Sequence, residues 1–196
     1  MNTQWIYWHF KKAIKNKDRK KLISMASKQG YRDATVLSED DGKCINKEET
    51  RSTDVSFSSD KYLYSLLCPL VVEANKSAEW LFDIDWYEDV QIARYKKNQH
   101  YAWHNDGRSD NSGKYGKDAG NFANKVRKLS LVAILSNGYS GGEFLIKSPY
   151  KDEPEKPDLG VGDVIVFPSY LQHTSNPVTK GTKYSAAMWC LGPPFR

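Results

Sequence analysis

The sequence predicts an α+β fold that is mainly β, an antiparallel sandwich or barrel with N-terminal helices packed on one side. Apolar residues in the first part of the chain recur at helical spacing. From about residue 86 the pattern changes to short apolar runs bounded by glycine, proline or polar residues, which is typical of strands. No helical pattern separates these runs, and this argues against a parallel α/β sheet.

Two helices are expected before the strands. The first has Asp18 as its N-cap and ends at Gly30. The second begins at Ser59 or Asp60, and Pro69 should kink or divide it. Its apolar face consists of Leu63, Leu66, Leu67, Leu70, Val71 and Ala74.

Short strands are expected in the second half. The segments are EDVQIARY, HYAWHND, KLSLVAILSN, GEFLIK, DVIVFPSY and KYSAAMWCL. A polar stretch over 107–122 interrupts them, and a loop of that length is usually functional or mobile. A chain of 196 residues suits a single domain, with helical support over about 1–85 and a catalytic core over about 86–192.

Composition narrows the functional classes. No apolar run approaches the roughly 20 residues that cross a bilayer, and the N-terminus lacks the features of a signal peptide. The three cysteines are far apart, which argues against a disulfide framework or a structural zinc site. We therefore expect a cytoplasmic protein with reduced thiols and no membrane contact.

The net charge of +5 is concentrated at the N-terminus, since residues 1–30 hold eight lysines and arginines against Asp18 alone. Such a segment can contact nucleic acid, a ribosome or an acidic partner. It is also typical of the solvated face of a surface helix, and the sequence leaves both interpretations open.

The stretch YAWHNDG, residues 101–107, holds the most specific chemical pattern. Alternation along a strand turns His104 and Asp106 to the same face, and His173 follows a later core strand. Two histidines and one carboxylate are the ligand set of non-haem Fe(II) oxygenases, which leave other metal positions open. Alone, the pair also fits an ordinary polar patch on a strand.

Lys183 lies ten residues after His173 and shares a strand face with Ser185, Ala187 and Trp189. A cation and a hydroxyl directed inward would suit a dicarboxylate whose other end chelates the metal. The alternative is a surface lysine on an edge strand.

Several ordered segments together resemble the Fe(II)- and 2-oxoglutarate-dependent dioxygenases, in particular the prolyl 4-hydroxylase-like group. They are RSTDVSF, QIARYKKNQHYAWHND, RKLSLVAILSN, YSGGEFLI and GDVIVFPSYLQHTSNPVTKGTKYSAAMW, within residues 51–192. The resemblance implies a distorted double-stranded β-helix, or jelly roll. It also implies iron bound by His104, Asp106 and His173, and a 2-oxoglutarate C5 carboxylate paired with Lys183. Tyr95 would be a nearby hydrogen-bond donor, and Ser130 and Ser185 are further candidates for the cofactor pocket.

The same resemblance implies hydroxylation of a prolyl residue in a peptide or protein, with succinate and CO2 as co-products and ascorbate as a reductant. Other interpretations stay open: a related oxygenase acting on nucleic acid or on a different residue, a non-catalytic jelly-roll binding module, and a metal-dependent hydrolase. Zinc should activate a hydrolase, whereas a nucleic-acid enzyme should bind its substrate in a salt-dependent way.

Overall fold

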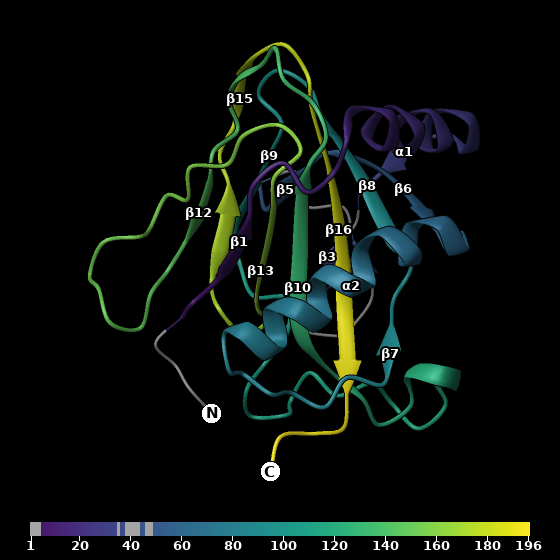
Figure 1. Cartoon of the computed structure of the whole chain (residues 1–196), viewed down its shortest axis with the longest axis vertical. Helices are drawn as coiled ribbons and strands as arrows, with labels where there is room; N and C mark the ends of the chain where they lie inside the picture. The colour runs from purple at the N-terminus through teal and green to yellow at the C-terminus, as the bar shows by residue number, and fades with distance from the viewer. Residues whose placement is uncertain (1–4, 35, 38–43, 46–48) are drawn as a thin grey trace.

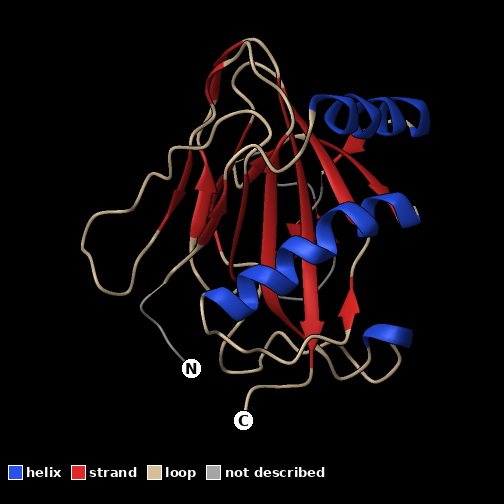
Figure 2. Ribbon diagram, viewed as in Figure 1, coloured by secondary structure: helices blue, strands red, loops and turns tan. Residues whose placement is uncertain are grey.

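A computed structural model describes the whole chain except residues 1–4, 35, 38–43 and 46–48. Two antiparallel sheets face each other, and the two longer helices lie on the outer side of the larger sheet (Figures 1 and 2). This arrangement confirms the predicted fold of mainly antiparallel strands with helices on one side. Among the described residues, neither helix is long and apolar enough to cross a membrane.

The larger sheet, called the major sheet below, carries most of the long strands. Its strand order is β1-β13-β10-β16-β8-β6-β2, and β7 pairs with β16. The bounds are β1 Trp8–Phe10, β2 Arg32–Asp33, β6 Asp54–Ser58, β7 Trp86–Tyr87, β8 Val90–Tyr95, β10 Val126–Ile134, β13 Val164–Pro168 and β16 Lys183–Gly192.

The smaller sheet, called the minor sheet, has the order β12-β14-β9-β5. Its strands are β5 Arg51–Ser52, β9 His100–His104, β12 Phe144–Ile146 and β14 His173–Ser175. Two short ribbons complete the described strands: β3 Val36–Leu37 with β4 Cys44–Ile45, and β11 Ser140–Gly141 with β15 Val178–Lys180. The N-terminal third therefore contributes strands to both sheets as well as helices.

The first helix, α1, spans Asn16–Gln29, so the predicted start at Asp18 was wrong. Lys15 is the N-cap, and Asp18 lies inside the first turn. The Asp18 carboxylate instead accepts a hydrogen bond of 2.7 Å from the hydroxyl of Tyr62 on the second helix. The predicted end at Gly30 is confirmed, because this residue is the C-cap at a positive φ of 93°.

The second helix, α2, spans Lys61–Ser77 with Asp60 as its N-cap, as predicted. Pro69 lies inside this helix and does not divide it. Tertiary packing explains the difference, because the buried side chains continue on one face on both sides of the proline. They are Leu63, Leu67, Val71 and Ala74.

Strand β13 shows how the sheets share the core. Val164 and Val166 pack with the cluster between the helices and the major sheet, whereas Ile165 and Phe167 pack with the cluster that includes Phe144 of the minor sheet. Alternating side chains thus bury both faces of this strand, as expected for an apolar run.

The long polar stretch over 107–122 is attached to the body. Its last residues form the short helix η1, Gly120–Phe122. The side-chain amide of Asn111 donates to the carbonyl of Phe195 at 2.9 Å and accepts from the Phe195 amide at 2.6 Å. The hydroxyl of Tyr115 donates to Glu88 at 2.9 Å. These contacts fix this loop against Glu88, which follows β7, and against the C-terminal segment.

Candidate metal and cofactor site

Strand pairing brings the two histidines together. In the minor sheet His104, the last residue of β9, lies opposite His173, the first residue of β14. A register shift follows between His173 and Ser175. Asp106 comes just after β9, where the amides of Asp106 and Gly107 both donate to the Ser169 carbonyl, at 3.0 and 2.9 Å.

The side chains of His104, Asp106 and His173 converge on one point. One ligand atom from each of the three lies within 4.8 Å of the others. The two Nε2 atoms are 3.6 Å (His104) and 3.4 Å (His173) from oxygens of the Asp106 carboxylate. The structure therefore brings together the three residues that the sequence singled out.

Main-chain carbonyls orient both imidazoles. His104 Nδ1 lies 2.8 Å from the Ala102 carbonyl, and His173 Nδ1 lies 3.0 Å from the Leu171 carbonyl. We assign the Nδ1–H tautomer to both rings, because a carbonyl can only accept. Each Nε2 is then left as a free acceptor toward Asp106, which is the orientation a metal ligand needs.

Burial lowers the pKa of His104, which favours the neutral ring that binds metals. Burial alone would raise the pKa of the Asp106 carboxyl, but the facing His173 and His104 hold it well below its usual value. Asp106 is therefore ionised, and its carboxylate faces the Nε2 atoms of both histidines. This donor set fits a divalent transition metal bound on one face.

Ser130 contacts Asp106, a metal-ligand candidate. Its hydroxyl donates to the Asp106 carboxylate at 2.7 Å and lies 2.9 Å from the Ser169 hydroxyl. A hydrogen-bond donor of this kind orients a ligating carboxylate.

Lys183 is almost fully buried, with 2% of its surface exposed. Its Nζ donates to the Gly142 carbonyl at 2.7 Å and to the Ser175 hydroxyl at 2.8 Å. An ammonium has three N–H groups, so one donor remains for a ligand. Burial lowers the pKa of Lys183 to about 8, against the opposing effect of Glu143.

A cavity of about 50 Å³ joins the two ends and is lined by Lys183 and by the three converging residues. Tyr95 and Ser185 also line it, and the Tyr95 ring centroid is 5.3 Å from Lys183 Nζ. Tyr95 lies directly opposite Lys183 in the β8–β16 pair. Six predicted positions thus line one cavity, which has a cation at one end and the His–Asp–His cluster at the other, whereas Ser130 is not among the lining residues.

A stack of three side chains supports His104 and was not predicted. The ring of Tyr101 lies parallel to the His104 imidazole, with centroids 3.5 Å apart. The buried guanidinium of Arg51 lies 4.4 Å from the centroid of the Tyr101 ring, and its Nη2 donates to Gln91 at 2.9 Å. Arg51 belongs to the RSTDVSF segment, so the resemblance marked the region without revealing the contact.

A charged pair supports Asp106 and was also not predicted. Glu88 accepts two bonds of 2.6 Å from the Arg127 guanidinium. The remaining Nη1 donates to the Asp106 carbonyl at 3.2 Å, and the guanidinium lies over the Trp189 ring. No local pattern links Glu88 with a residue 39 positions away. Only the strand pairing brings them together.

The sequence of this chain is similar to that of known proteins. Residues 90–191 match the family model described as the 2OG-Fe(II) oxygenase superfamily. A PKHD-type hydroxylase of Pseudomonas putida (strain W619) is 38% identical over 63 residues, which are 31% of this chain and 27% of that protein. A protein of Acanthamoeba polyphaga mimivirus with a provisional prolyl 4-hydroxylase name is 28% identical, over 76% of this chain and 64% of that protein. The chain therefore spans less than two thirds of the length of either relative.

Solved structures share the fold. The viral collagen prolyl hydroxylase of Paramecium Bursaria Chlorella virus-1, in its 2OG complex, has a TM-score of 0.68 at 23% identity, covering 98% of this chain and 99% of that one. A Pseudomonas putida prolyl-4-hydroxylase has a TM-score of 0.71 at 16% identity, covering 95% and 93%. At these identities the likeness concerns the fold, and it confirms the predicted jelly roll.

Proposed function

The chain belongs to the 2OG-Fe(II) oxygenase superfamily, as its sequence predicted, and we propose that it hydroxylates a prolyl residue of a peptide or protein. The observation that carries this proposal is one buried cavity with His104, Asp106 and His173 at one end and Lys183 at the other. The family's cofactors, Fe(II) and 2-oxoglutarate, match the chemistry of these two ends.

In this proposal the two Nε2 atoms and the Asp106 carboxylate hold Fe(II), and Lys183 holds the distal carboxylate of 2-oxoglutarate. The bound pair supplies the oxidising power for C–H cleavage, one oxygen atom of O2 going to the substrate and the other to succinate as CO2 is released. Tyr95 and Ser185 line the wall near Lys183 and offer hydroxyls to the same carboxylate.

Charge balance supports this assignment. A buried cation such as Lys183 is costly unless an anion accompanies it. The two charges of Fe(II) and the charge of Lys183 are matched by the Asp106 carboxylate and the two carboxylates of 2-oxoglutarate. The filled cavity would then be neutral, whereas neither cofactor alone would balance it.

Aromatic packing keeps water from the ligands. The Phe167 ring lies 4.7 Å and the Phe144 ring 5.6 Å from the His173 imidazole, measured between centroids. Tyr101 covers His104 on its other side. These contacts fix the planes of the two imidazole rings and leave their Nε2 atoms free to coordinate a metal ion.

The prolyl target rests on the names of the relatives. One structural neighbour is a Trichoplax adhaerens prolyl hydroxylase in complex with a peptide fragment of a hypoxia inducible factor degradation domain. In this chain Trp189 lines the cavity and Trp103, on the ligand strand β9, is 37% exposed. Trp189 is therefore placed to contact a peptide near the metal end, whereas alternation along β9 turns Trp103 to the face opposite His104.

The test is turnover of proline-containing peptides with Fe(II), 2-oxoglutarate and ascorbate, followed by mass spectrometry. We expect a gain of one oxygen on proline and a matching amount of succinate. Turnover of single-stranded nucleic acid but of no peptide would contradict the prolyl assignment and favour the basic helix α1 as a substrate-binding element. Activation by zinc without 2-oxoglutarate would contradict the oxygenase itself.

A further inference from the structure

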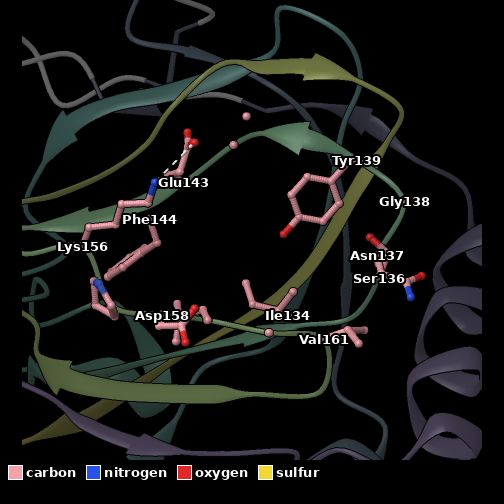
Figure 3. Close-up of a pocket in the computed structure, with 15 residues that line it drawn as sticks. Ile134, Ser136, Asn137, Gly138, Tyr139, Glu143, Phe144, Lys156, Asp158 and Val161 are labelled. Atoms are coloured by element: carbon pink, nitrogen blue, oxygen red, sulfur yellow. Dashed lines mark ion pairs between the residues drawn. The ribbon is translucent and has the colours of Figure 1, made fainter.

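A second and larger cavity, of about 430 Å³, lies beyond Lys183. It is bounded by the segment 134–144, which runs from the end of β10 to the start of β12, and by the segment 156–161, which precedes β13 (Figure 3). Small-molecule sites commonly have volumes of about 300–1,000 Å³. The proposed reaction uses the smaller cavity, so this one has no role in it.

Hydrogen bonds fix both walls of this second cavity. On one wall the Gly142 amide donates to the Pro177 carbonyl at 3.0 Å, and the Glu143 carbonyl accepts from the Asn176 amide at 2.9 Å. On the other wall the Asp163 carboxylate accepts from the Gly160 amide at 2.9 Å. A ligand would therefore enter a preformed site with little ordering cost.

The lining combines an apolar surface with a few polar groups. Ile134, Phe144 and Leu159 contribute apolar area. The Tyr139 hydroxyl points into the space (Figure 3), and no hydrogen bond to it occurs among the described residues. Asp158 stands at the edge, likewise without an ion pair in the described part of the chain.

Among the described residues that line the cavity, the one lysine, Lys156, already has a partner. Lys156 Nζ lies 3.6 Å from the Glu143 carboxylate, as the dashed line in Figure 3 shows. Asp158 is thus the charge left for a ligand, and its sign selects a cation. An anionic ligand would meet two carboxylates and would have to displace Glu143 from Lys156.

We propose that this cavity is a second small-molecule site, which binds an organic amine with an aromatic or branched apolar body. The ammonium pairs with Asp158 and donates to the Tyr139 hydroxyl, while the body packs against Ile134 and Phe144. Ligands without a positive charge lack the first contact and bind more weakly.

Binding at this site is coupled to the 2-oxoglutarate end, a part of the inference that rests on the proposed function. Phe144 lines both cavities, and the Gly142 carbonyl, which faces the second cavity's wall, holds Lys183 Nζ. An ammonium held at Asp158 adds positive charge on the side of the cavity wall that Gly142 shares with Lys183, so it attracts the dicarboxylate. The amine should therefore strengthen 2-oxoglutarate binding about threefold, and 2-oxoglutarate should strengthen amine binding by the same factor.

The first experiment uses ligand-observed and amide NMR on the full chain without iron or 2-oxoglutarate. The probes are 2-phenylethylamine and 3-phenylpropionate, which have similar shapes and opposite charges. We expect the amine to shift the amides of Gly138, Gly142 and Gly160, and the acid to leave them unchanged. D158N should weaken amine binding about fivefold, whereas the matched control D152N, an exposed position outside the cavity, should not.

Equal binding of the acid, or an unchanged affinity in D158N, would overturn the proposal. V161W should fill the cavity and abolish binding, and Y139F gives a second, milder variant if V161W does not fold. Because this experiment needs no cofactor, its outcome is independent of whether the chain is an oxygenase.

The second experiment measures the dissociation constant of 2-oxoglutarate in the anaerobic Fe(II) protein with and without saturating 2-phenylethylamine. A threefold strengthening in the native chain that is lost in D158N supports the coupling. Amine binding with an unchanged 2-oxoglutarate affinity would overturn the coupling. A failure of 2-oxoglutarate to bind at all would instead contradict the proposed function.

Discussion

The major and minor sheets contribute to the candidate site in different ways. The minor sheet, whose strands have two to five residues, positions His104 and His173 at its strand ends, with Asp106 in the loop after β9. The major sheet contributes Lys183 and Ser185 from the ten-residue strand β16 and Tyr95 from β8. The two ends of the cavity therefore take their candidate ligand-binding side chains from different sheets.

The two sheets also differ in the charge they present. The minor-sheet end has an ionised Asp106 facing two histidine ring nitrogens and so attracts a cation. The major-sheet end has a buried ammonium and so attracts an anion. It follows that replacing His173 should alter mainly metal binding, whereas replacing Lys183 should alter mainly dicarboxylate binding.

The largest effect is expected from His173→Ala in the minor sheet. Loss of residues that merely orient a ligand already costs about 10–100-fold in metal affinity, so loss of a ligand should cost at least about a hundredfold. Equilibrium dialysis with Fe(II) under anaerobic conditions measures this. His100→Ala is the matched control, because His100 lies on the same sheet and its Nε2 contacts the Glu49 carbonyl at 3.2 Å. Similar Fe(II) affinities in the two variants would contradict the ligand assignment.

Lys183→Met in the major sheet should leave Fe(II) affinity within about twofold and weaken 2-oxoglutarate binding. A hydrogen bond to a charged group contributes about 1.5–3 kcal/mol, which corresponds to a loss of roughly ten- to hundredfold in affinity. Calorimetric titration of the metal-loaded protein measures it, with the exposed Lys180→Met as control. An equal loss of Fe(II) affinity and 2-oxoglutarate affinity in Lys183→Met would contradict the separate roles of His173 and Lys183.

The pH dependence of 2-oxoglutarate affinity also tests whether Lys183 binds this dicarboxylate. The pKa of Lys183 in the free protein is lowered to about 8 by burial, so the ammonium is present below this pH and is lost above it. Affinity should therefore be constant from pH 6.5 to 7.5 and fall above pH 8, by up to about tenfold per pH unit. Lys183→Arg should bind independently of pH over this range, because arginine stays charged. A native profile as flat as that of the arginine variant would contradict the assignment.

A smaller effect is expected from Glu88→Gln, which affects the link between the two sheets. Arg127 on β10 would keep its bond to the Asp106 carbonyl but lose its carboxylate partner, leaving a partly buried charge unpaired. We expect the free energy of unfolding to fall by about 2 kcal/mol and Fe(II) affinity to fall severalfold. Urea denaturation checks this, with the exposed Glu153→Gln as a control expected within about 0.5 kcal/mol. An equal free energy of unfolding in Glu88→Gln and Glu153→Gln would contradict a stabilising role for the Glu88–Arg127 pair.

The smallest effect is expected from Gly107→Ala, next to Asp106. An added Cβ would lie 2.9 Å from the Arg127 carbonyl and 3.2 Å from the Cβ of Ser169, so the backbone must shift. We expect a loss of about 1–2 kcal/mol in the free energy of unfolding. Gly116→Ala is the matched control on the same loop, because nothing lies within 4 Å of its added Cβ. Stability should then change by less than about 0.5 kcal/mol.

The sequence predicted correctly those parts of the fold that depend on interactions between residues close together in the chain. The strand segments, the N-cap Asp60 and the C-cap Gly30 all follow from short-range spacing, and the structure confirms them. Asp18 was misassigned because its carboxylate is used by Tyr62, 44 positions away, which no local rule reveals. Pro69 did not interrupt α2 because packing against the sheet outweighs the lost hydrogen bond.

In the candidate site, too, some features follow from local spacing and others depend on long-range contacts. The convergence of His104 and Asp106, and the inward face of Lys183, could be inferred from alternation along strands, although β9 ends at His104 and Asp106 lies in the loop after it. The contacts that orient them could not, because Arg127, Glu88 and Arg51 meet their partners only through sheet pairing. The family resemblance named the residues, and only the three-dimensional structure shows that Ser130 contacts Asp106.

The most direct test is anaerobic addition of Fe(II) and then 2-oxoglutarate to the native chain, followed by visible absorption spectroscopy. We expect a weak charge-transfer band from the chelated pair. It should be absent in His173→Ala, recovered only at high 2-oxoglutarate in Lys183→Met, and unchanged in His100→Ala. Folded, iron-loaded native protein that gave no band with saturating 2-oxoglutarate would contradict the account that one cavity holds both cofactors.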